Sequence, residues 1–351
     1  MTNADFWRGR RVFLTGHTGF KGGWLSLWLS AMDAKVYGYA LAPPSTPSLF
    51  ETGRIAETLE AGTIGDIRDF EALQSAMRQA EPQIVIHMAA QPIVRLSYAE
   101  PVETYATNVM GTVHVLEAVR GMESVAAVIN VTSDKCYENR ELQRAYREDD
   151  PMGGHDPYSS SKGCAELVAQ CYQRSYFGQG VSLASVRAGN VIGGGDWAAD
   201  RIIPDFFRAL DAGEAMTIRS PDAVRPWQHV LEPLSGYLLL AEKLFRHGSV
   251  LSGGWNFGPE DGDTWTARQI VDYLTRDGGL VRTANSAQPH EANTLKLDSG
   301  KARRQLGWAP RWTIEKALDM TRQWYQAWRN SEDMHRVTLA QIEAYAGNGD
   351  G

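Results

Sequence analysis

Near its start the chain passes from a short apolar run, through a glycine-rich turn, into a helix-length apolar segment. The run is 12–15, the glycines are Gly16, Gly19 and Gly22, and the helical segment is 24–32. Glycines allow a tight turn and let the backbone approach a pyrophosphate, while the N-terminus of the next helix offers free N–H groups. A strand, such a turn and a helix in succession predict a dinucleotide-binding unit.

Strand-length and helix-length segments keep alternating through the first half of the chain. The next predicted strands are 35–41, 84–87, 126–131 and 181–187, and the next predicted helices are 67–80, 102–119 and 157–176. Parallel strands need a long crossover, which a helix supplies, so this repetition predicts a doubly wound parallel sheet. We therefore expect an α/β, Rossmann-like fold.

The alternation weakens after Arg187, and 351 residues exceed one ordinary core. A glycine run at 193–195 and scattered arginines indicate a smaller substrate-binding domain, whereas the helix 231–245 and the strand 255–257 are expected to return to the sheet. The C-terminal substrate-binding domain is therefore predicted to be interleaved with the first. The predicted division is a Rossmann domain at 1–187, rejoined by about 231–260, a substrate domain at 188–230 and 261–330, and a C-terminal tail at 331–351.

The composition narrows the class of partner. With 43% apolar and 22% charged residues the chain is typical of a globular protein. No apolar stretch reaches the roughly 20 residues that span a bilayer, so no membrane segment is expected. The net charge of −7 offers no basic footprint for nucleic acid, and the eight histidines show no metal-ligand spacing. Three cysteines without a C-x-x-C pair indicate a reducing compartment, so we expect a cytoplasmic protein.

Four polar residues follow the predicted strand at 126–131. They are Thr132, Ser133, Asp134 and Lys135. Open parallel sheets bind ligands beyond the carboxyl ends of their strands. We therefore expect a hydroxyl, a carboxylate and an amine to share one pocket.

A tyrosine and a lysine four residues apart open a later predicted helix. Asp156 is expected to cap this helix, which places Tyr158 in its first turn. Lys162 lies on the same face one turn later, where its ammonium is expected to stabilise a tyrosinate and lower the pKa of Tyr158 below about 10. A pair at this spacing is usually a solvated helix face. The glycine-rich turn and Ser133 favour a catalytic pair instead.

The glycine-rich turn, the hydroxyl at the strand end and the Tyr-x-x-x-Lys helix resemble, in that order, the extended short-chain dehydrogenase/reductase family. Longer motifs resemble a narrower group within it, the nucleotide-sugar 4,6-dehydratases that act on CDP-glucose. These motifs are TGHTGFKG at 15–22, TSDK at 132–135, RAGNVIGGGDW at 187–197, DRIIPD at 200–205 and RPWQHV at 225–230. The resemblance covers nearly all of the chain.

This resemblance implies that CDP-glucose loses water across C5 and C6, with NAD regenerated in each cycle. Tyr158 would take the proton of the C4 hydroxyl while hydride leaves to NAD+, and Ser133 would hydrogen-bond the C4 oxygen. Lys162 would hold the cofactor ribose. Asp134 matches the family's acid, which protonates the departing C6 oxygen because hydroxide is a poor leaving group.

The sequence leaves the base at C5 open. Related dTDP-glucose and GDP-mannose dehydratases carry a glutamate after the aspartate, whereas this sequence has Lys135, as is typical of the CDP-sugar branch. A lysine abstracts a proton only when it is neutral, which requires burial or a neighbouring positive charge to lower its pKa. We expect Lys135 to assist elimination, as a base or by stabilising the enolate. The alternative is a surface lysine paired with Asp134 or Glu138.

The resemblance also implies binding residues. For NAD they are Gly16, Thr18, Gly19, Phe20, Lys21, Gly22, Asp66, Ile67, Ala89 and Ala90, together with Tyr158 and Lys162. For CDP-glucose they are Gln91, Asn190, Arg201 and Arg225, and Arg225 is expected to meet the diphosphate.

Some of these assignments stay open at the level of sequence. Lys21 either touches a phosphate or is a solvated lysine, and Asp66 either contacts adenine or caps a helix. Arg201 either contacts the substrate or lies at the surface. The second predicted strand, 35–41, ends without an acid or an arginine, so the preference for NAD over NADP is undecided there.

The resemblance further implies a homodimer, with helices 102–119 and 157–176 in a four-helix interface, although a core-facing stripe would look the same in sequence. Two other functions would use part of the same set of residues. An NAD-dependent nucleotide-sugar 4-epimerase needs Tyr158 and Lys162 but has no use for an acid such as Asp134. A non-catalytic NAD-binding sensor on the same fold would not need all of these groups together.

Overall fold

The computed structural model describes residues 2–178, 180–260, 263–283 and 294–347. Within the predicted substrate domain, 261–262 and 284–293 lie outside the described residues, as do 348–351 of the predicted tail.

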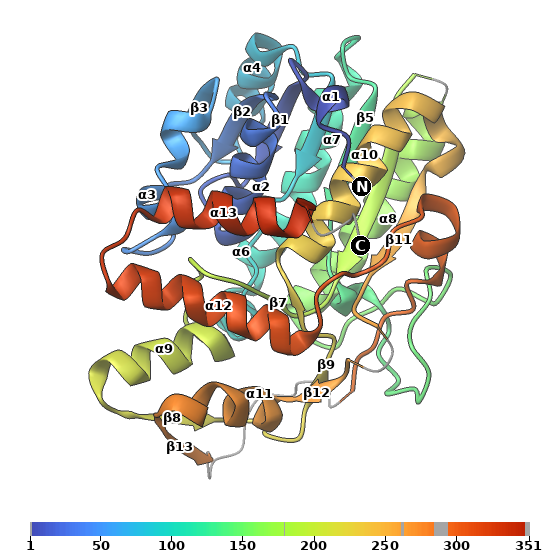
Figure 1. The fold of residues 1–351 in the computed structure, drawn as a ribbon. Coiled ribbons are helices and arrows are strands. Elements are labelled where there is room, and N and C mark those ends of the chain that lie inside the picture. The colour runs from blue at the N-terminus through green and yellow to red at the C-terminus, as the bar shows by residue number, and fades with distance from the viewer. Residues whose placement is uncertain (1, 179, 261–262, 284–293, 348–351) are drawn as a thin grey trace.

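One seven-stranded sheet organises the molecule, and every pairing between its strands is parallel (Figure 1). The strands are β1 (Arg11–Thr15), β2 (Lys35–Ala40), β3 (Ala61–Ile64), β4 (Ile84–His87), β5 (Ala127–Val131), β6 (Ser182–Ala188) and β11 (Gly253–Phe257). Their order across the sheet is β11-β6-β5-β4-β1-β2-β3. The predicted Rossmann-like fold is confirmed, and the strand predicted at 255–257 pairs with β6.

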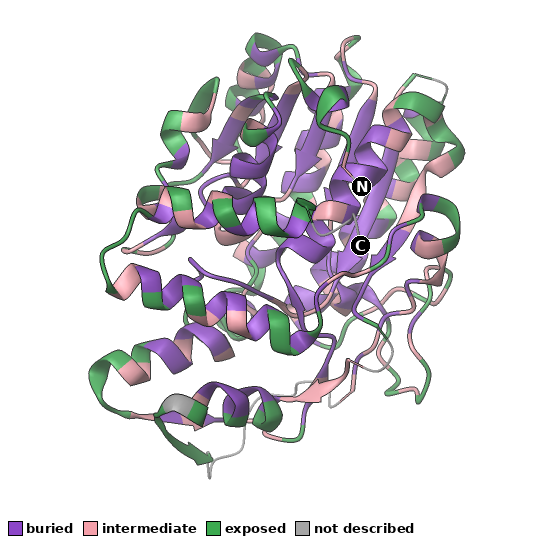
Figure 2. Cartoon of the chain, in the orientation of Figure 1, coloured by how far each residue is buried: buried purple, intermediate pink, exposed green. Residues whose placement is uncertain are grey.

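Helices cover both faces of this sheet. They are α2 (Phe20–Ala31), α4 (Phe70–Ala80), α7 (Gly111–Arg120), α8 (Pro157–Tyr172) and α10 (Leu231–His247). Val12 and Leu14 of β1 pack in the core that contains α2 and α10, whereas Phe13 packs in the core that contains α4 and α7. Side chains of a strand alternate between faces, so β1 fills both cores. Figure 2 shows the sheet buried throughout its centre.

The starts of two helices differ from the prediction. Helix α2 begins at Phe20, with Gly19 as its N-cap, so Gly22 lies inside the helix. Helix α4 begins at Phe70, and the side chain of Asp69 accepts the capping hydrogen bond. The interpretation of Asp66 as a helix cap was therefore wrong. The predicted helix at 102–119 is a continuous helical stretch made of α6 (Pro101–Tyr105), a π turn (Ala106–Met110) and α7.

Shorter elements gather beyond the carboxyl ends of the strands. Three small pairs of strands lie there, namely β7 (Val191–Ile192) with β10 (Gln228–His229), β9 (Val224–Arg225) with β12 (Trp265–Thr266), and β8 (Ala215–Ile218) with β13 (Leu280–Thr283). The helices of this region are α9 (Ile202–Ala212), α11 (Ala267–Leu274) and α12 (Ile314–Arg329) (Figure 1). The remaining short helices are α1 (Ala4–Trp7), α3 (Leu49–Thr52) and α5 (Val94–Ala99).

The last described segment forms a helix, α13 (Met334–Gly347), which packs against α2. Its Tyr345 hydroxyl donates a 2.7 Å hydrogen bond to Glu232, which also accepts from the backbone of Trp312 at 2.8 Å. Burial raises the pKa of Glu232 to about 7. The segment predicted as a tail is thus fastened to the main body along its described length.

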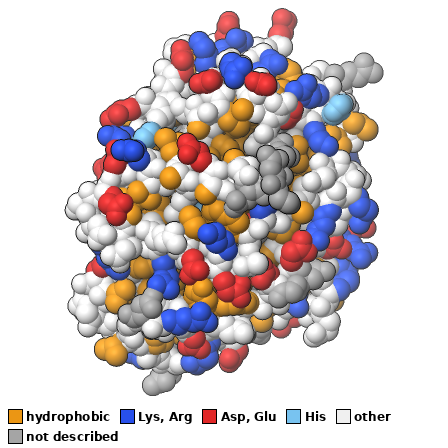
Figure 3. Space-filling view, viewed as in Figure 1, with side chains coloured by type: hydrophobic (Ala, Val, Ile, Leu, Met, Phe, Trp, Pro, Cys, Tyr) orange, Lys and Arg blue, Asp and Glu red, His pale blue; other side chains and the backbone are white. Residues whose placement is uncertain are grey.

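The surface carries side chains of both charges. On the face shown in Figure 3, Lys and Arg side chains are interspersed with Asp and Glu. Within the described ranges no helix is long and apolar enough to cross a membrane. The same residues contain no group of three or more His, Cys, Asp or Glu that could hold a metal ion.

Candidate active site

A cavity of about 820 Å³ lies at the carboxyl ends of the parallel strands. Neighbouring strands β1 and β4 carry crossovers that leave in opposite directions, and ligands bind at such a switch point. Every residue that the sequence predicted for the site lines this cavity. They are Gly16, Thr18, Gly19, Phe20, Lys21, Gly22, Asp66, Ile67, Ala89, Ala90, Gln91, Ser133, Asp134, Lys135, Tyr158, Lys162, Asn190, Arg201 and Arg225.

The glycine-rich turn after β1 is a tight cradle. Gly16 has a φ of +82°, a conformation that favours glycine. A Cβ on Gly22 would lie 2.0 Å from the carbonyl oxygen of Gly16, so no larger residue fits there. The hydroxyl of Thr18 donates to the carbonyl of Leu41 at 2.8 Å and ties the turn to the end of β2. The backbone amides at the start of α2 can then face a phosphate, so these residues fit a dinucleotide.

Another part of the cavity wall, in the segment after β3, contains an ion pair. Asp66 accepts hydrogen bonds from the guanidinium of Arg68, with a 2.9 Å contact to its Nε, and Arg68 also pairs with Glu103. Hydrogen bonding from Arg68 lowers the pKa of Asp66. Asp66 is therefore an ionised acceptor at the rim, whereas Ser45 and Ser48 line the wall beyond β2.

The turn after β5 holds the predicted acid. Ser133 donates a 3.0 Å hydrogen bond to Oδ1 of Asp134 and accepts one from the backbone of Lys135 at 3.2 Å. The second oxygen of Asp134, Oδ2, is buried and has no hydrogen-bond partner among the described residues. Burial raises the pKa of Asp134. The carboxyl group can therefore hold a proton.

Helix α8 presents the tyrosine and the lysine from its first turns. Asp156 caps the helix, accepting from the backbone of Ser159 at 2.9 Å, as predicted. Burial raises the pKa of Tyr158 to about 12, although a hydrogen bond with Ser133 opposes this shift. Burial lowers the pKa of Lys162 to about 8. The expected lowering of the Tyr158 pKa is therefore absent here, because desolvation outweighs the neighbouring groups.

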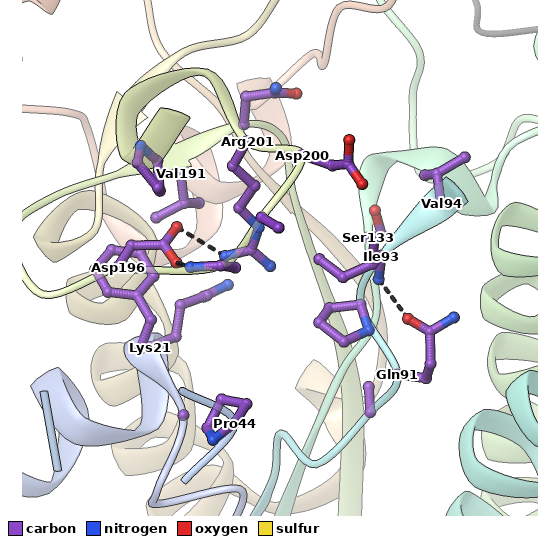
Figure 4. A pocket seen from close by; sticks show the side chains of 18 of the residues that line it. Lys21, Pro44, Gln91, Ile93, Val94, Ser133, Val191, Asp196, Asp200 and Arg201 are labelled. Carbon is purple, nitrogen blue, oxygen red and sulfur yellow. Dashed lines mark hydrogen bonds and ion pairs between the residues drawn. The ribbon is translucent and has the colours of Figure 1, made fainter. Parts of the chain in front are cut away.

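Two cationic side chains, Arg201 and Lys21, lie across the cavity from Ser133 (Figure 4). Arg201 donates to Asp196 at 2.9 Å and lines the cavity, and its side chain is 32% exposed. The ammonium of Lys21 donates to the hydroxyl of Tyr237 at 3.1 Å. Burial lowers the pKa of Lys21 to about 7, and the charges of Lys162 and Arg201 contribute. The solvated alternative for Lys21 was therefore wrong.

The other predicted substrate residues include Arg225 and Gln91, which make different contacts. Arg225 is buried in β9, and its charge opposes the rise in the pKa of Asp134. Gln91 uses its amide internally, donating to Thr104 at 2.9 Å and accepting from the backbone of Ile93 at 2.5 Å. Gln91 thus shapes the loop after β4, and Arg225 lies close enough to act on the catalytic turn.

Some residues of the cavity region were not found from the sequence. His17 is buried beside Gly38, where a Cβ would lie 2.6 Å from its ring, and burial lowers its pKa to about 4. The glycine inside the second strand was the available signal for this packing. Arg219 also lines the cavity, but nothing in its local sequence distinguishes it from a surface residue.

Comparisons with known proteins agree with this geometry. The family model of GDP-mannose 4,6-dehydratase matches residues 13–321. The chain is 54% identical to CDP-glucose 4,6-dehydratase of Salmonella typhimurium, covering 98% of both chains. It is 27% identical to dTDP-D-glucose 4,6-dehydratase of Mus musculus, over 76% of both. Among solved structures it resembles dTDP-glucose 4,6-dehydratase DesIV of Streptomyces venezuelae with NAD bound, at 25% identity and a TM-score of 0.78, covering 93% of this chain and 99% of DesIV.

Proposed function

The chain belongs to the GDP-mannose 4,6-dehydratase family, and we propose that it converts CDP-glucose to CDP-4-keto-6-deoxyglucose and water. The observation that carries this proposal is the 54% identity to the Salmonella typhimurium CDP-glucose 4,6-dehydratase over 98% of both chains. The arrangement of the cavity supports it, because an acid and a redox pair meet in one place.

The cofactor of this reaction is NAD. The tight turn at Gly16 and Gly22 and the free N-terminus of α2 fit its pyrophosphate. Bound NAD would supply a hydride acceptor for C4 and a hydride donor for C6, so none would be consumed. Lys162 lies one turn from Tyr158 and is suited to hold the ribose beside the reacting carbon.

Oxidation at C4 needs a base for the hydroxyl proton, and Tyr158 takes that role. A phenol whose pKa is near 12 must first lose its proton, and a bound nicotinamide cation would favour the tyrosinate by Coulomb attraction. The hydroxyl of Ser133 forms hydrogen bonds with both Tyr158 and Asp134, so it can orient the C4 oxygen of the substrate. The ketone formed at C4 then acidifies the proton on C5.

Elimination needs a proton for the C6 oxygen and an acceptor for the C5 proton. Asp134 supplies the proton, because burial favours its neutral form and its Oδ2 is not otherwise engaged among the described residues. Lys135 follows directly and lines the same cavity, so it assists removal of the C5 proton. The C5–H and C6–O bonds break, a C5=C6 double bond forms, and water leaves.

The diphosphate of the substrate requires local positive charge in an acidic protein. Arg225 and Arg201, which both line the cavity, supply it. Asn190, which follows β6, contacts the diphosphate or the sugar. Gln91 acts through the loop whose backbone it holds.

The test is incubation of the purified protein with NAD and, separately, CDP-, dTDP-, UDP- and GDP-glucose, followed by mass spectrometry and NMR. Loss of one water from CDP-glucose alone is the expected result. An unchanged mass with an inverted C4 centre would indicate an epimerase, and an unchanged panel would indicate a binding protein. Either outcome would overturn the proposal.

The protein is also proposed to be a cytoplasmic homodimer. Its three cysteines are free, as a reducing compartment favours. Large apolar side chains are exposed on the helical stretch 101–120 and on α8, including Val102 at 81% and Leu167 at 56%. Exposed apolar surface of this kind marks an interface. Light scattering should give twice the chain mass for the wild type and a monomer for Val102→Glu/Leu167→Glu.

A further inference from the structure

A buried ion pair lies behind the catalytic turn, which consists of residues 133–135 after β5. None of the steps above uses this ion pair. The guanidinium of Arg187, on β6, donates two parallel hydrogen bonds to Glu166, on α8, each 2.8 Å long. Both side chains are 1% exposed. A Cβ on Gly254 would lie 2.3 Å from Arg187, so the neighbouring strand β11 leaves room for this side chain alone.

Hydrogen bonds join the ion pair to the residues on both sides of the catalytic turn. Before the turn, the hydroxyl of Thr132 donates to Glu166 at 2.5 Å. After it, the hydroxyl of Tyr137 accepts from Arg187 at 2.6 Å and donates to Asn256 at 2.7 Å. Ser133, Asp134 and Lys135 all lie between these two attachment points. Arg187 therefore fixes the backbone that carries the groups for elimination.

The same ion pair fixes the helix that carries the groups for oxidation. Glu166 lies one turn after Lys162 on α8, and its charge acts on that lysine. Gly163, between them, lets the turn approach closely, because a Cβ there would lie 3.2 Å from the carbonyl of Cys136. Helix α8 and the turn are thus joined by direct packing and by one shared guanidinium.

The two parts of the proposed reaction explain why helix α8 and the catalytic turn need a fixed spacing. Proton transfer at C4 and elimination across C5 and C6 act on adjacent carbons of one sugar, so their groups must keep one spacing throughout the cycle. A misplacement of about 1 Å can lower a rate by about 100-fold. We propose that Arg187, acting through Glu166 and Tyr137, is a positioning residue that holds the oxidising helix and the eliminating turn in register. This inference rests on the proposed dehydratase function.

The test separates the two half-reactions in a single turnover of NAD-loaded enzyme with CDP-glucose. NADH fluorescence rises with oxidation at C4 and falls when hydride returns to C6 after elimination. The variants are Tyr137→Phe and Thr132→Val, each of which removes one hydroxyl and keeps the buried ion pair. Tyr146→Phe is the matched control, because this buried tyrosine stacks on Tyr137 without joining Arg187. Circular dichroism reports folding of each variant.

In Tyr137→Phe and Thr132→Val, NADH formation should slow less than NADH decay, because of the three turn residues only Ser133 serves the oxidation. Decay should slow about 10- to 100-fold, with release of some CDP-4-keto-glucose that retains its C6 oxygen. KM should stay unchanged, and Arg187→Lys, which keeps the charge but loses the fork, should behave similarly. Tyr146→Phe should match the wild type. Equal slowing of both phases, or wild-type decay in all three variants, would overturn the proposal. A wild type that gives neither NADH nor dehydrated product would instead overturn the proposed function, and this proposal with it.

Discussion

The hydroxyl of Ser133 donates to Oδ1 of Asp134 across 3.0 Å, and the opposite carboxyl oxygen has no hydrogen-bond partner among the described residues. That second oxygen faces Gly189, where a Cβ would lie 3.1 Å away. One side of the carboxyl group is thus held while the other side stays available. This division suits a group that must hold its proton until a leaving group arrives.

Replacement of Asp134 by asparagine should abolish elimination yet stabilise the fold at neutral pH. The folded-state pKa of Asp134 is raised by burial, so the folded protein binds a proton that the unfolded chain releases as pH rises above about 4. The wild type therefore loses stability over that rise, and Asp134→Asn does not. Urea unfolding of both proteins at pH 4 and pH 7 measures this. A variant no more stable than the wild type at pH 7 would contradict the buried neutral acid, and the exposed Asp222→Asn serves as control.

Loss of the phenol should stop the first step. Tyr158→Phe is expected to lower turnover by about 10²- to 10⁴-fold, the usual contribution of a general base. Substrate affinity should change little, because the diphosphate carries most of the charge. Rapid-mixing fluorescence should show no NADH. Tyr172→Phe, on the part of α8 that contacts Glu117 instead, should react normally.

Replacement of Lys135 should affect only the later step. Lys135→Met is expected to accumulate NADH and to lower turnover by about 100-fold, since C5 deprotonation fails after C4 is oxidised. The measurement is exchange of the C5 proton with D₂O, followed by NMR. Full turnover with normal exchange in Lys135→Met would assign no role to this lysine.

The substitution Gly22→Ala should disrupt the glycine-rich turn after β1. The added Cβ would lie 2.0 Å from the Gly16 carbonyl oxygen, so the turn or the start of α2 must shift. Overpacking of this kind costs about 1–3 kcal/mol and should abolish NAD binding in calorimetric titration. Gly121→Ala provides the comparison, because its Cβ would meet its nearest neighbour at 3.7 Å. Normal NAD binding by Gly22→Ala would place the pyrophosphate elsewhere.

The stability that comes from packing α13 against the rest of the protein should depend on pH through Glu232. Its folded-state pKa is about 7, above its ordinary value of 4.5, so the folded protein keeps a proton that the unfolded chain loses. Stability should therefore fall between about pH 4.5 and pH 7 in the wild type, and Glu232→Gln should remove that part of the fall. Thermal unfolding at both pH values measures it. The exposed Glu214→Gln should follow the wild type.

Most of the sheet could be predicted because strands leave a local pattern, whereas most of the cavity residues were implied by the resemblance to nucleotide-sugar dehydratases. Apolar runs located every strand of the sheet except β3, whose four residues are all exposed, and the edge rule for parallel strands placed Ser133 at the site. The meeting of Tyr158 with Ser133 was implied by the resemblance. The ionisation of Tyr158 could not be predicted, because it depends on burial by segments far along the chain. The pairing of Glu166 with Arg187 was hidden for the same reason, since each alone is an ordinary charged residue.

The cavity is assembled from segments that run from Gly16 to Ala267 in the sequence. During synthesis the nucleotide turn emerges long before β11 and before Ala267, the first residue of α11, which also lines the cavity. Strand β11 must then pair with β6, the strand that carries Arg187. A nascent chain therefore cannot acquire catalytic competence piecemeal, and any defect late in the sequence should disable groups made early.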